Sequence, residues 1–216
     1  MTLQLGVLAS GGGSNLQALL DAASAGRLDA RVAAVVSDNP QAYALERARR
    51  AGVAAEVVPA GGLSREEHDR RLVAVLERHG VDTVALAGYM RLVSPVLLRA
   101  FPGRVLNIHP ALLPSFPGLH VHAQVIAHGA KFSGCTVHFV DEGTDTGPIV
   151  IQAVVPVRDD DTPETLAARI LREEHRIYPE ALQYLAEGRL RRAGRRVLLA
   201  PPSPASGTLH NPAVRS

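Results

Sequence analysis

The first half of the chain alternates apolar segments with stretches of helical spacing, and this alternation constrains the fold more than any other feature. The apolar segments are mostly hydrophobic and do not alternate with polar residues, as in strands that are buried on both faces of a sheet. A parallel sheet covered by helices on both faces satisfies this pattern. The expected strands are 3–9, 32–36, 54–58 and 84–87, and the expected helices are 14–25, 41–51 and 64–79.

The second half of the chain has a different pattern. An expected strand at 104–108 runs into residues 107–119, which carry three prolines and many turn signals. Two longer expected strands, 132–140 and 149–157, flank the turn-rich segment 141–148, which favours antiparallel pairing. Further expected elements are helices at 120–128 and 162–187 and a hairpin at 189–199. The prediction for the whole chain is an α/β, doubly wound fold with a mostly parallel sheet, helices on both faces and an antiparallel C-terminal part.

Length and composition set the domain organisation. With 216 residues, of which 46% are hydrophobic and 20% charged, the chain is typical of a soluble globular protein with one well-filled core. Residues 1–199 are expected to form a single domain. Residues 200–216 contain four prolines and no periodicity, which predicts a disordered tail. No apolar run approaches the ~20 residues that cross a bilayer, and the N-terminus lacks the basic region of a secretory signal, so we expect a cytoplasmic protein.

Charge and cysteine content disfavour several functional classes. The single cysteine, Cys135, excludes an internal disulfide and a cysteine-cluster metal site, and we expect it to be a buried small hydrophobe. A net charge of +2 without interleaved aromatic residues disfavours nucleic-acid binding. His120 and His122, with His109 and His138, have no spacing typical of zinc ligands, so no metal is expected.

A glycine cluster, Ser10-Gly11-Gly12-Gly13-Ser14-Asn15, lies between the first expected strand and the first expected helix. Glycine lets the backbone approach an anion closely, and a helix start offers free N–H groups. The dinucleotide fingerprint would need a third glycine at Leu16, and the Lys-Ser/Thr of a P-loop is absent. A terminal monophosphate is therefore the favoured ligand. A tight turn without a ligand is the alternative.

Asn107 and His109 stand at the end of an expected strand, where open α/β folds bind their ligands. In an extended segment their side chains point the same way, so an amide and an imidazole could both donate to a developing oxyanion. An imidazolium needs a carboxylate, and Asp145 in the following turn-rich segment is a candidate. The alternative is a strand-end Asn, a core His and a turn Asp without a common role.

Six segments together resemble the phosphoribosylglycinamide formyltransferase family over about residues 3–199. They are Gly-Ser-Asn-Leu-Gln-Ala-Leu (13–19), Leu-Ala-Gly-Tyr-Met-Arg (86–91), Leu-Asn-Ile-His-Pro-Ala-Leu-Leu-Pro (106–114), Phe-Pro-Gly-Leu-His (116–120), Val-His-Phe-Val-Asp-Glu (137–142) and Glu-His-Arg-Ile-Tyr-Pro (174–179). The Asn-x-His-Pro segment is shared by the wider formyltransferase superfamily. The Gly-Ser-Asn-Leu-Gln loop is more particular to the named family.

The resemblance implies a role for each matching position. Asn107, His109 and Asp145 match the catalytic trio. Gly13, Ser14 and Asn15 match the loop that holds the ribonucleotide phosphate, and Glu174 matches the acid that binds the ribose hydroxyls. His120 and His138 would line the cleft near Asp145. The positions that match folate contacts are Arg65, Met90, Arg91, Leu92, Val93, Asn107, Asp141, Glu142, Gly143, Thr144 and Asp145.

The activity that the resemblance implies is direct transfer of a formyl group from 10-formyltetrahydrofolate, the cosubstrate, to the amine of glycinamide ribonucleotide in purine synthesis. The amine itself is the nucleophile, so the reaction needs no metal. Asn107 and His109 would stabilise the tetrahedral oxyanion, and Asp145 would keep His109 protonated. The implied partners are small-molecule substrates, without nucleic acid or membrane, for a monomer or homodimer.

Two alternatives remain open. Within the superfamily, formyltetrahydrofolate hydrolase and methionyl-tRNA formyltransferase carry an additional domain, for which 216 residues are expected to leave no room. The other alternative is a nucleotide-binding module of the same fold without chemistry. The spacing of Asn107 and His109, together with Asp145, disfavours such a module, because a pure binder has no use for a charged oxyanion site.

Overall fold

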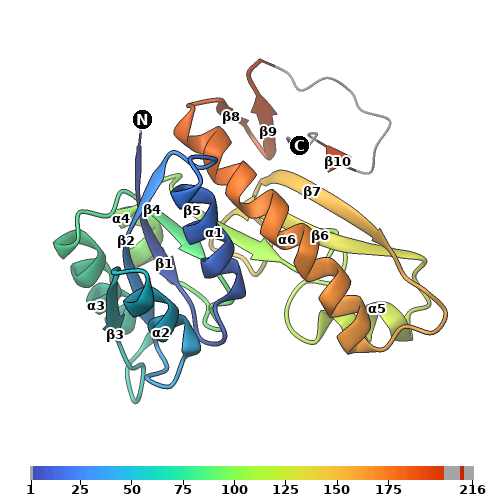
Figure 1. Cartoon of the computed structure of the whole chain (residues 1–216), viewed down its shortest axis with the longest axis horizontal. Helices are drawn as coiled ribbons and strands as arrows, with labels where there is room; N and C mark the ends of the chain where they lie inside the picture. The colour runs from blue at the N-terminus through green and yellow to red at the C-terminus, as the bar shows by residue number, and fades with distance from the viewer. Residues whose placement is uncertain (1, 202–209, 212–216) are drawn as a thin grey trace. The chain divides into compact units, whose positions relative to one another are not determined.

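The computed structural model describes residues 2–201, 210 and 211 of the chain (Figure 1). These residues group into two units, one that ends at Asn107 and one that begins at Ile108. The expectation of a single domain over residues 1–199 stays a prediction.

The first unit is built on parallel strands. Its strands follow the order β5-β4-β1-β2-β3, and every neighbouring pair is parallel. The strands are β1 (Leu3–Leu8), β2 (Ala30–Ser37), β3 (Ala54–Val57), β4 (Thr83–Leu86) and β5 (Val105–His109). Leu5, Val7 and Leu8 of the central strand are fully buried, as their continuously apolar sequence predicts.

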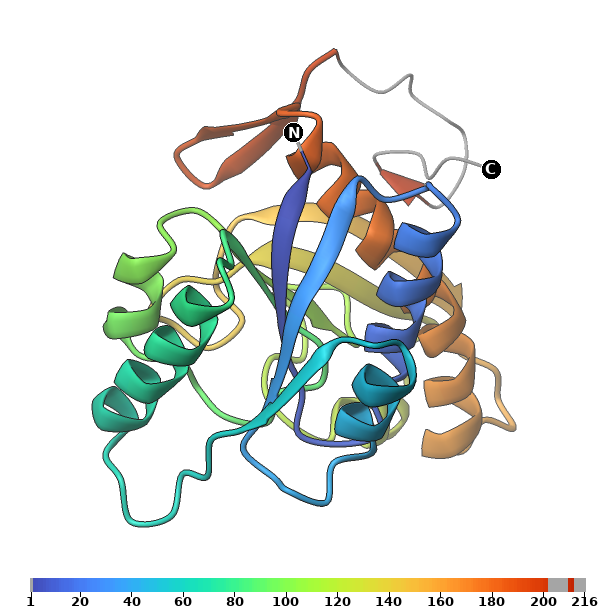
Figure 2. The ribbon, with the colours of Figure 1, turned by 60° about the vertical axis from the view of Figure 1, so that its left-hand side comes forward.

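Helices cover both faces of this parallel sheet. They are α1 (Ser14–Ser24), α2 (Tyr43–Arg50), α3 (Arg65–Arg78) and α4 (Pro95–Ala100). Figure 2 shows α1 and α2 on one side of β1 and β2, and α3 and α4 on the other. The core between these layers contains Leu16 and Leu19 from α1 and Leu72 and Leu76 from α3, all with no exposed surface. The predicted doubly wound arrangement is confirmed.

Local signals in the sequence set where two of these helices begin. Ser64 accepts from the Glu67 N–H while the Glu67 side chain accepts from the Ser64 N–H, so α3 starts with a capping box. Ser94 caps α4 by accepting from Val96, and Pro95 occupies the first helical position.

The second unit contains the antiparallel strands. Strand β6 (Phe132–Phe139) pairs antiparallel with β7 (Ile149–Pro156), as predicted. Helix α6 (Pro163–Ala186) packs against both strands and against α5 (Val121–Ala127). Helix α6 begins at a capping box between Thr162 and Thr165 and buries large side chains such as Tyr178 and Tyr184.

A short hairpin follows α6. Strands β8 (Leu190–Ala193) and β9 (Arg196–Leu199) pair antiparallel, which confirms the expected hairpin. Of the predicted tail, residues 202–209 and 212–216 lie outside the described residues. Of its four described residues, His210 and Asn211 form β10 (His210–Asn211), which pairs antiparallel with Gln152 and Ala153 of β7. No local pattern in the sequence predicts this strand.

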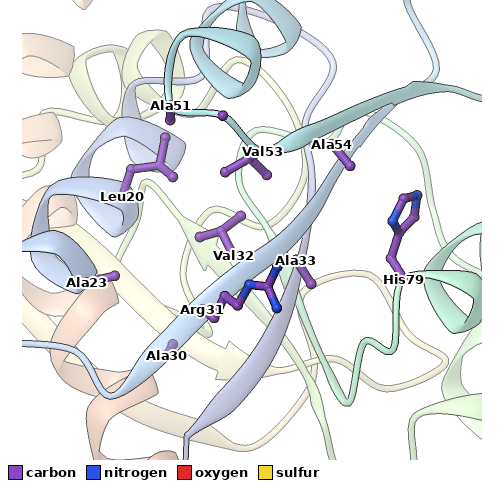
Figure 3. Close-up of a pocket in the computed structure, with 11 residues that line it drawn as sticks. Leu20, Ala23, Ala30, Arg31, Val32, Ala33, Ala51, Val53, Ala54 and His79 are labelled. Carbon is purple, nitrogen blue, oxygen red and sulfur yellow. The ribbon is translucent and has the colours of Figure 1, made fainter.

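A cavity of about 560 Å³ lies beside the amino-terminal ends of β2 and β3 (Figure 3). Small apolar side chains from α1, β2 and residues 51–54 line it, with Arg31 and His79 as its two basic residues. Open α/β sheets bind their ligands at the opposite, carboxyl edge. This cavity therefore lies away from the edge where a ligand is expected. Within the described part of the chain, no helix is both long and apolar enough to span a membrane.

Candidate active site

The carboxyl ends of the parallel strands bring several predicted site segments to one edge of the first unit. The glycine loop, defined here as Ser10–Gly13, follows β1, and the segment Met90–Val93 follows β4. Asn107 lies near the end of β5, the neighbour of β4. The fold thus places at one edge three segments that are far apart in the sequence.

Gly13 ends the glycine loop in a conformation that only glycine adopts easily. Its φ is 69°, and it occupies the position before the first residue of α1 with no side-chain cap. A Cβ atom at this position would lie 2.8 Å from both Cα and Cβ of Ala44 on α2. The start of α1 therefore offers N–H groups that its own helix does not satisfy, which is the arrangement that binds an anion.

Helix α2 holds the glycine loop from outside. The Ala44 N–H donates to the Gly11 carbonyl at 3.0 Å, and Nε of Arg47 donates to the Gly12 carbonyl at 2.8 Å. The same guanidinium donates through Nη1 to Oε1 of Gln17 on α1 at 3.0 Å. Nothing in the sequence marks Arg47 as part of the site, because its contacts join segments whose spacing follows no local pattern.

The segment Met90–Val93 exposes apolar side chains. Met90 is 63% and Leu92 53% exposed, whereas Val93 is buried. The Met90 N–H donates to Oγ of Ser10 at 3.0 Å, which ties this segment to the glycine loop. Arg65 is exposed at the first position of α3. Exposed apolar groups with a nearby backbone anchor suit a flat, largely apolar ligand.

Strand β5 carries Asn107 and His109 with one residue between them, so both side chains point to the same side of the strand. Asn107 is half-buried, and His109 is 4% exposed. Nε2 of His109 lies 2.8 Å from the Phe116 carbonyl oxygen. The expected parallel projection of the amide and the imidazole is thus present on the strand.

Asp145 lies beside the other nitrogen of the same ring. Oδ2 of Asp145 is 3.3 Å from Nδ1 of His109 and accepts a hydrogen bond from the Gly118 N–H at 2.9 Å. Oδ1 of Asp145 faces Nε2 of His138 at 3.7 Å. The structure therefore brings His138 near Asp145, as expected, while His120 stands exposed at the start of α5. The contacts from the Phe116 carbonyl and the Gly118 N–H could not be predicted from the sequence, because every residue has such backbone groups.

The surroundings of Asp145 favour its ionised form. Burial raises the pKa of this carboxyl, but the side-chain hydrogen bond from His138, the Gly118 N–H and the nearby charges of His109 and His138 together lower it by more. The net pKa lies below the ordinary value for aspartate. Asp145 is thus a carboxylate held against an imidazole in a largely buried site.

The segment that carries Asp145 is internally braced. Oδ1 of Asp141 accepts from Oγ1 of Thr146 at 2.6 Å and from the Gly143 N–H at 3.1 Å. Asp145 itself has a φ of 54°, which is uncommon for a residue with a side chain. Glu142 and Thr144 are exposed. Asp141 therefore braces the loop from within, whereas Asp145 faces His109.

The remaining candidate residues lie on α6 and β6. Glu174 is a buried carboxylate of α6, and Cys135 of β6 is fully buried, as predicted. Burial raises the pKa of the Cys135 thiol, and the charges of Glu174 and Glu173 raise it further, so this thiol is not a nucleophile. Among the residues that the structure describes, no group of three or more His, Cys, Asp or Glu side chains could hold a metal ion.

Known proteins share this sequence and fold. The formyl transferase family matches residues 3–182. The phosphoribosylglycinamide formyltransferase of Escherichia coli is 45% identical over 86% of this chain and 88% of its own. The crystal structure of glycinamide ribonucleotide transformylase 1 from Symbiobacterium toebii is 57% identical, with a TM-score of 0.90 over 92% of this chain and 94% of its own.

A more distant relative is an enzyme of a different activity. The crystal structure of a formyltetrahydrofolate deformylase from Pseudomonas syringae is 27% identical, with a TM-score of 0.86. It covers 92% of this chain, which in turn covers 66% of that relative. The family match spans well over half of this sequence, and the E. coli relative is matched over most of its length. The chain belongs to the formyl transferase family.

Proposed function

We propose that this protein transfers the formyl group of 10-formyltetrahydrofolate to the amine of 5-phosphoribosylglycinamide, a step in purine biosynthesis. The observation that carries this proposal is the carboxylate–imidazole pair of Asp145 and His109, in which His109 lies on the same strand as Asn107. The high identity to phosphoribosylglycinamide formyltransferases over most of the chain supports this particular substrate.

Each ligand group has a matching set of residues. The ribonucleotide phosphate binds Gly13, Ser14 and Asn15, where the start of α1 attracts an anion. The buried carboxylate of Glu174 accepts hydrogen bonds from the ribose hydroxyls. The folate binds the exposed apolar groups of Met90–Val93, with Arg65 and Asp141–Asp145 completing its contacts.

The reaction begins when the amine nitrogen attacks the formyl carbon, which forms the new C–N bond and places negative charge on the formyl oxygen. The amide of Asn107 and the imidazolium of His109 donate hydrogen bonds to this oxyanion. The bond between the formyl carbon and the folate nitrogen then breaks. The proton lost by the attacking amine passes through Asp145 and water to that leaving nitrogen, so charge and protons balance.

The contacts of the two ring nitrogens of His109 determine how the ring donates to the oxyanion. Nδ1 faces the Asp145 carboxylate, and Nε2 faces the Phe116 carbonyl, so both positions next to the ring are acceptors. An imidazolium satisfies both with its two N–H groups, whereas either neutral tautomer leaves one lone pair facing an acceptor oxygen. To reach the oxyanion, Nε2 exchanges its bond to Phe116 for one to the formyl oxygen.

The same proposal includes the location of the enzyme, its partners and its oligomeric state. The enzyme works in the cytoplasm on two small molecules, without nucleic acid, as a monomer or homodimer. Its formyl donor acts as a cosubstrate. In this mechanism every proton and charge belongs to a substrate or to a residue of this chain, and no step uses a metal.

Two other functions make different demands on the site. Hydrolysis of the formyl folate would use water in place of the amine, and the deformylase relative is much less similar in sequence than the transformylases. A binding module without chemistry would gain nothing from an ionised Asp145 buried against His109. The pair therefore favours catalysis, and the identity favours the amine as acceptor.

One assay separates these functions. We would follow the absorbance of the folate product with purified protein and 10-formyltetrahydrofolate, in the presence and absence of glycinamide ribonucleotide. We expect turnover only with both substrates. Turnover without the ribonucleotide would instead show a hydrolase, and no turnover with both would show a binding module.

A further inference from the structure

The β8–β9 hairpin carries four exposed arginines, and two of them contact the segment around Asp145. The four are Arg191, Arg192, Arg195 and Arg196. Surface arginines are usually solvated and contribute little to stability. Arg192 and Arg195 differ from this pattern because they contact other residues of the protein. Arg191 and Arg196 on the same hairpin serve as a comparison.

Arg195 holds the far end of the loop that carries Asp145. Its Nη2 donates to the carbonyl oxygen of Thr146 at 2.7 Å, although 49 positions separate the two residues in the chain. Thr146 directly follows Asp145. The guanidinium of Arg192 lies over the ring of Phe139, 5.4 Å from its centre. Phe139 ends β6, so the hairpin contacts the chain on both sides of residues 140–145.

Thr146 connects this external contact to the inside of the loop. Its hydroxyl donates to Asp141, which also accepts from the Gly143 N–H. A Cβ atom on Gly143 would lie 2.0 Å from Oγ1 of Thr146, so the two residues are in close contact. A shift of Thr146 would therefore move the whole turn and, with it, the backbone of Asp145.

We propose that Arg195 is a positioning residue: by fixing the Thr146 carbonyl, it keeps the Asp145 carboxylate on Nδ1 of His109 and shapes the folate-binding loop 141–145. The φ of 54° at Asp145 lies in the left-handed region, which residues with a side chain adopt infrequently, so an outside contact helps to hold it there. Arg192 supports the same loop through Phe139. This inference rests on the role that the proposed function gives to Asp145.

The matched control lies one position further along the hairpin. Arg196, like Arg191, makes no side-chain hydrogen bond or ion pair with any residue that the structure describes. Arg195→Ala and Arg196→Ala therefore remove the same charge from the same hairpin, and only the first removes a contact with Thr146. Arg195→Lys keeps one donor that can reach a carbonyl.

The first measurement is steady-state kinetics with both substrates. For Arg195→Ala we expect kcat/KM for the folate to fall by about threefold to tenfold in total, the size of one lost hydrogen bond, through a higher folate KM together with a lower kcat. The ribonucleotide KM should stay unchanged. Arg195→Lys should recover most of the loss, and Arg196→Ala should match the wild type. If the KM values for the folate and the ribonucleotide rise equally, the protein is destabilised as a whole and Arg195 is not a positioning residue.

The second measurement does not depend on activity. Amide hydrogen exchange of a peptide covering 140–147 should speed up in Arg195→Ala and not in Arg196→Ala, while peptides of the parallel sheet stay unchanged. If this peptide exchanges equally in the two variants, or if exchange rises without any kinetic change, the inference is wrong. A wild-type protein without transferase activity would instead contradict the proposed function, and the exchange data would still decide whether Arg195 holds the loop.

Discussion

Nδ1 of His109 lies 3.3 Å from Oδ2 of Asp145, while Nε2 of the same ring faces the Phe116 carbonyl oxygen at 2.8 Å. The imidazole is thus held between a carboxylate and a carbonyl, both of which accept hydrogen bonds. Each ring nitrogen thus faces an oxygen to which an N–H group can donate. The Asp145 carboxylate places a negative charge beside the ring, and the Phe116 carbonyl orients the ring. The charge can be removed by substitution without removing the carbonyl.

Replacing Asp145 with Asn keeps the shape of the side chain and one acceptor oxygen but removes the charge that holds the His109 proton. We expect kcat to fall by at least ~10²-fold, the usual cost of removing one preorganised electrostatic group. The ribonucleotide KM should change little, because Gly13–Asn15 and Glu174 hold that substrate. Stopped-flow and steady-state rates would measure this change. A folded variant with kcat within about threefold of wild type would remove Asp145 from the mechanism.

The same carboxylate has a consequence for acid stability. The pKa of Asp145 is lower in the folded protein than its ordinary value of about 3.9 in an unfolded chain. Its ionised form therefore stabilises the fold above about pH 4, and this contribution is lost as the pH falls through the lower folded value. Thermal melts of wild type and Asp145→Asn should differ most near neutral pH and converge in acid. A difference that grows as the pH falls would contradict this assignment.

Gly13→Val tests the glycine loop. The new Cβ would meet Ala44 at 2.8 Å and would sit at a φ of 69°, so the loop must shift away from its phosphate-binding position. We expect a steep rise in the ribonucleotide KM with little change in folate affinity. Gly26→Val is the control, because Gly26 has the same φ of 69° just after α1 but open space for a side chain. Equal effects of the two substitutions would show that strain, and not loss of phosphate binding, explains the result.

Arg47→Ala tests how the glycine loop is held. The substitution removes the donors to the Gly12 carbonyl and to Gln17. The ribonucleotide KM should rise by about threefold to tenfold, and the folate KM should not change. Arg49→Ala is the control, since Arg49 is exposed on the same helix and only approaches Glu46 at 3.9 Å. If both variants bind the ribonucleotide equally well, Arg47 is a surface residue without a role in the loop.

Local sequence signals were sufficient for most of the fold. The Ser64–Glu67 capping box, the Ser94-Pro95 start of α4 and the apolar strands each depend on residues within a few positions of one another. The strand that carries Asn107 and His109 was predicted for the same reason, and so was the direction of their side chains.

The remaining features depend on contacts between distant parts of the chain. The Phe116 carbonyl on His109, the Gly118 N–H on Asp145 and the Arg195 contact with Thr146 involve backbone groups, which every residue possesses. No residue type marks them in advance. Asp145 was named from the resemblance and from its turn, but its distance from His109 could come only from the folded chain.

The close approach of Gly13 to α2 also limits which substitutions this protein can accept at positions 13 and 44. A side chain at position 13 would collide with Cα of Ala44 as well as with its Cβ. Shortening residue 44 to glycine removes only the second collision, because the first is with the main chain itself. A substitution at Gly13 therefore has no second-site suppressor at position 44, and a genetic selection for revertants would return the original glycine or changes that move α2 as a whole.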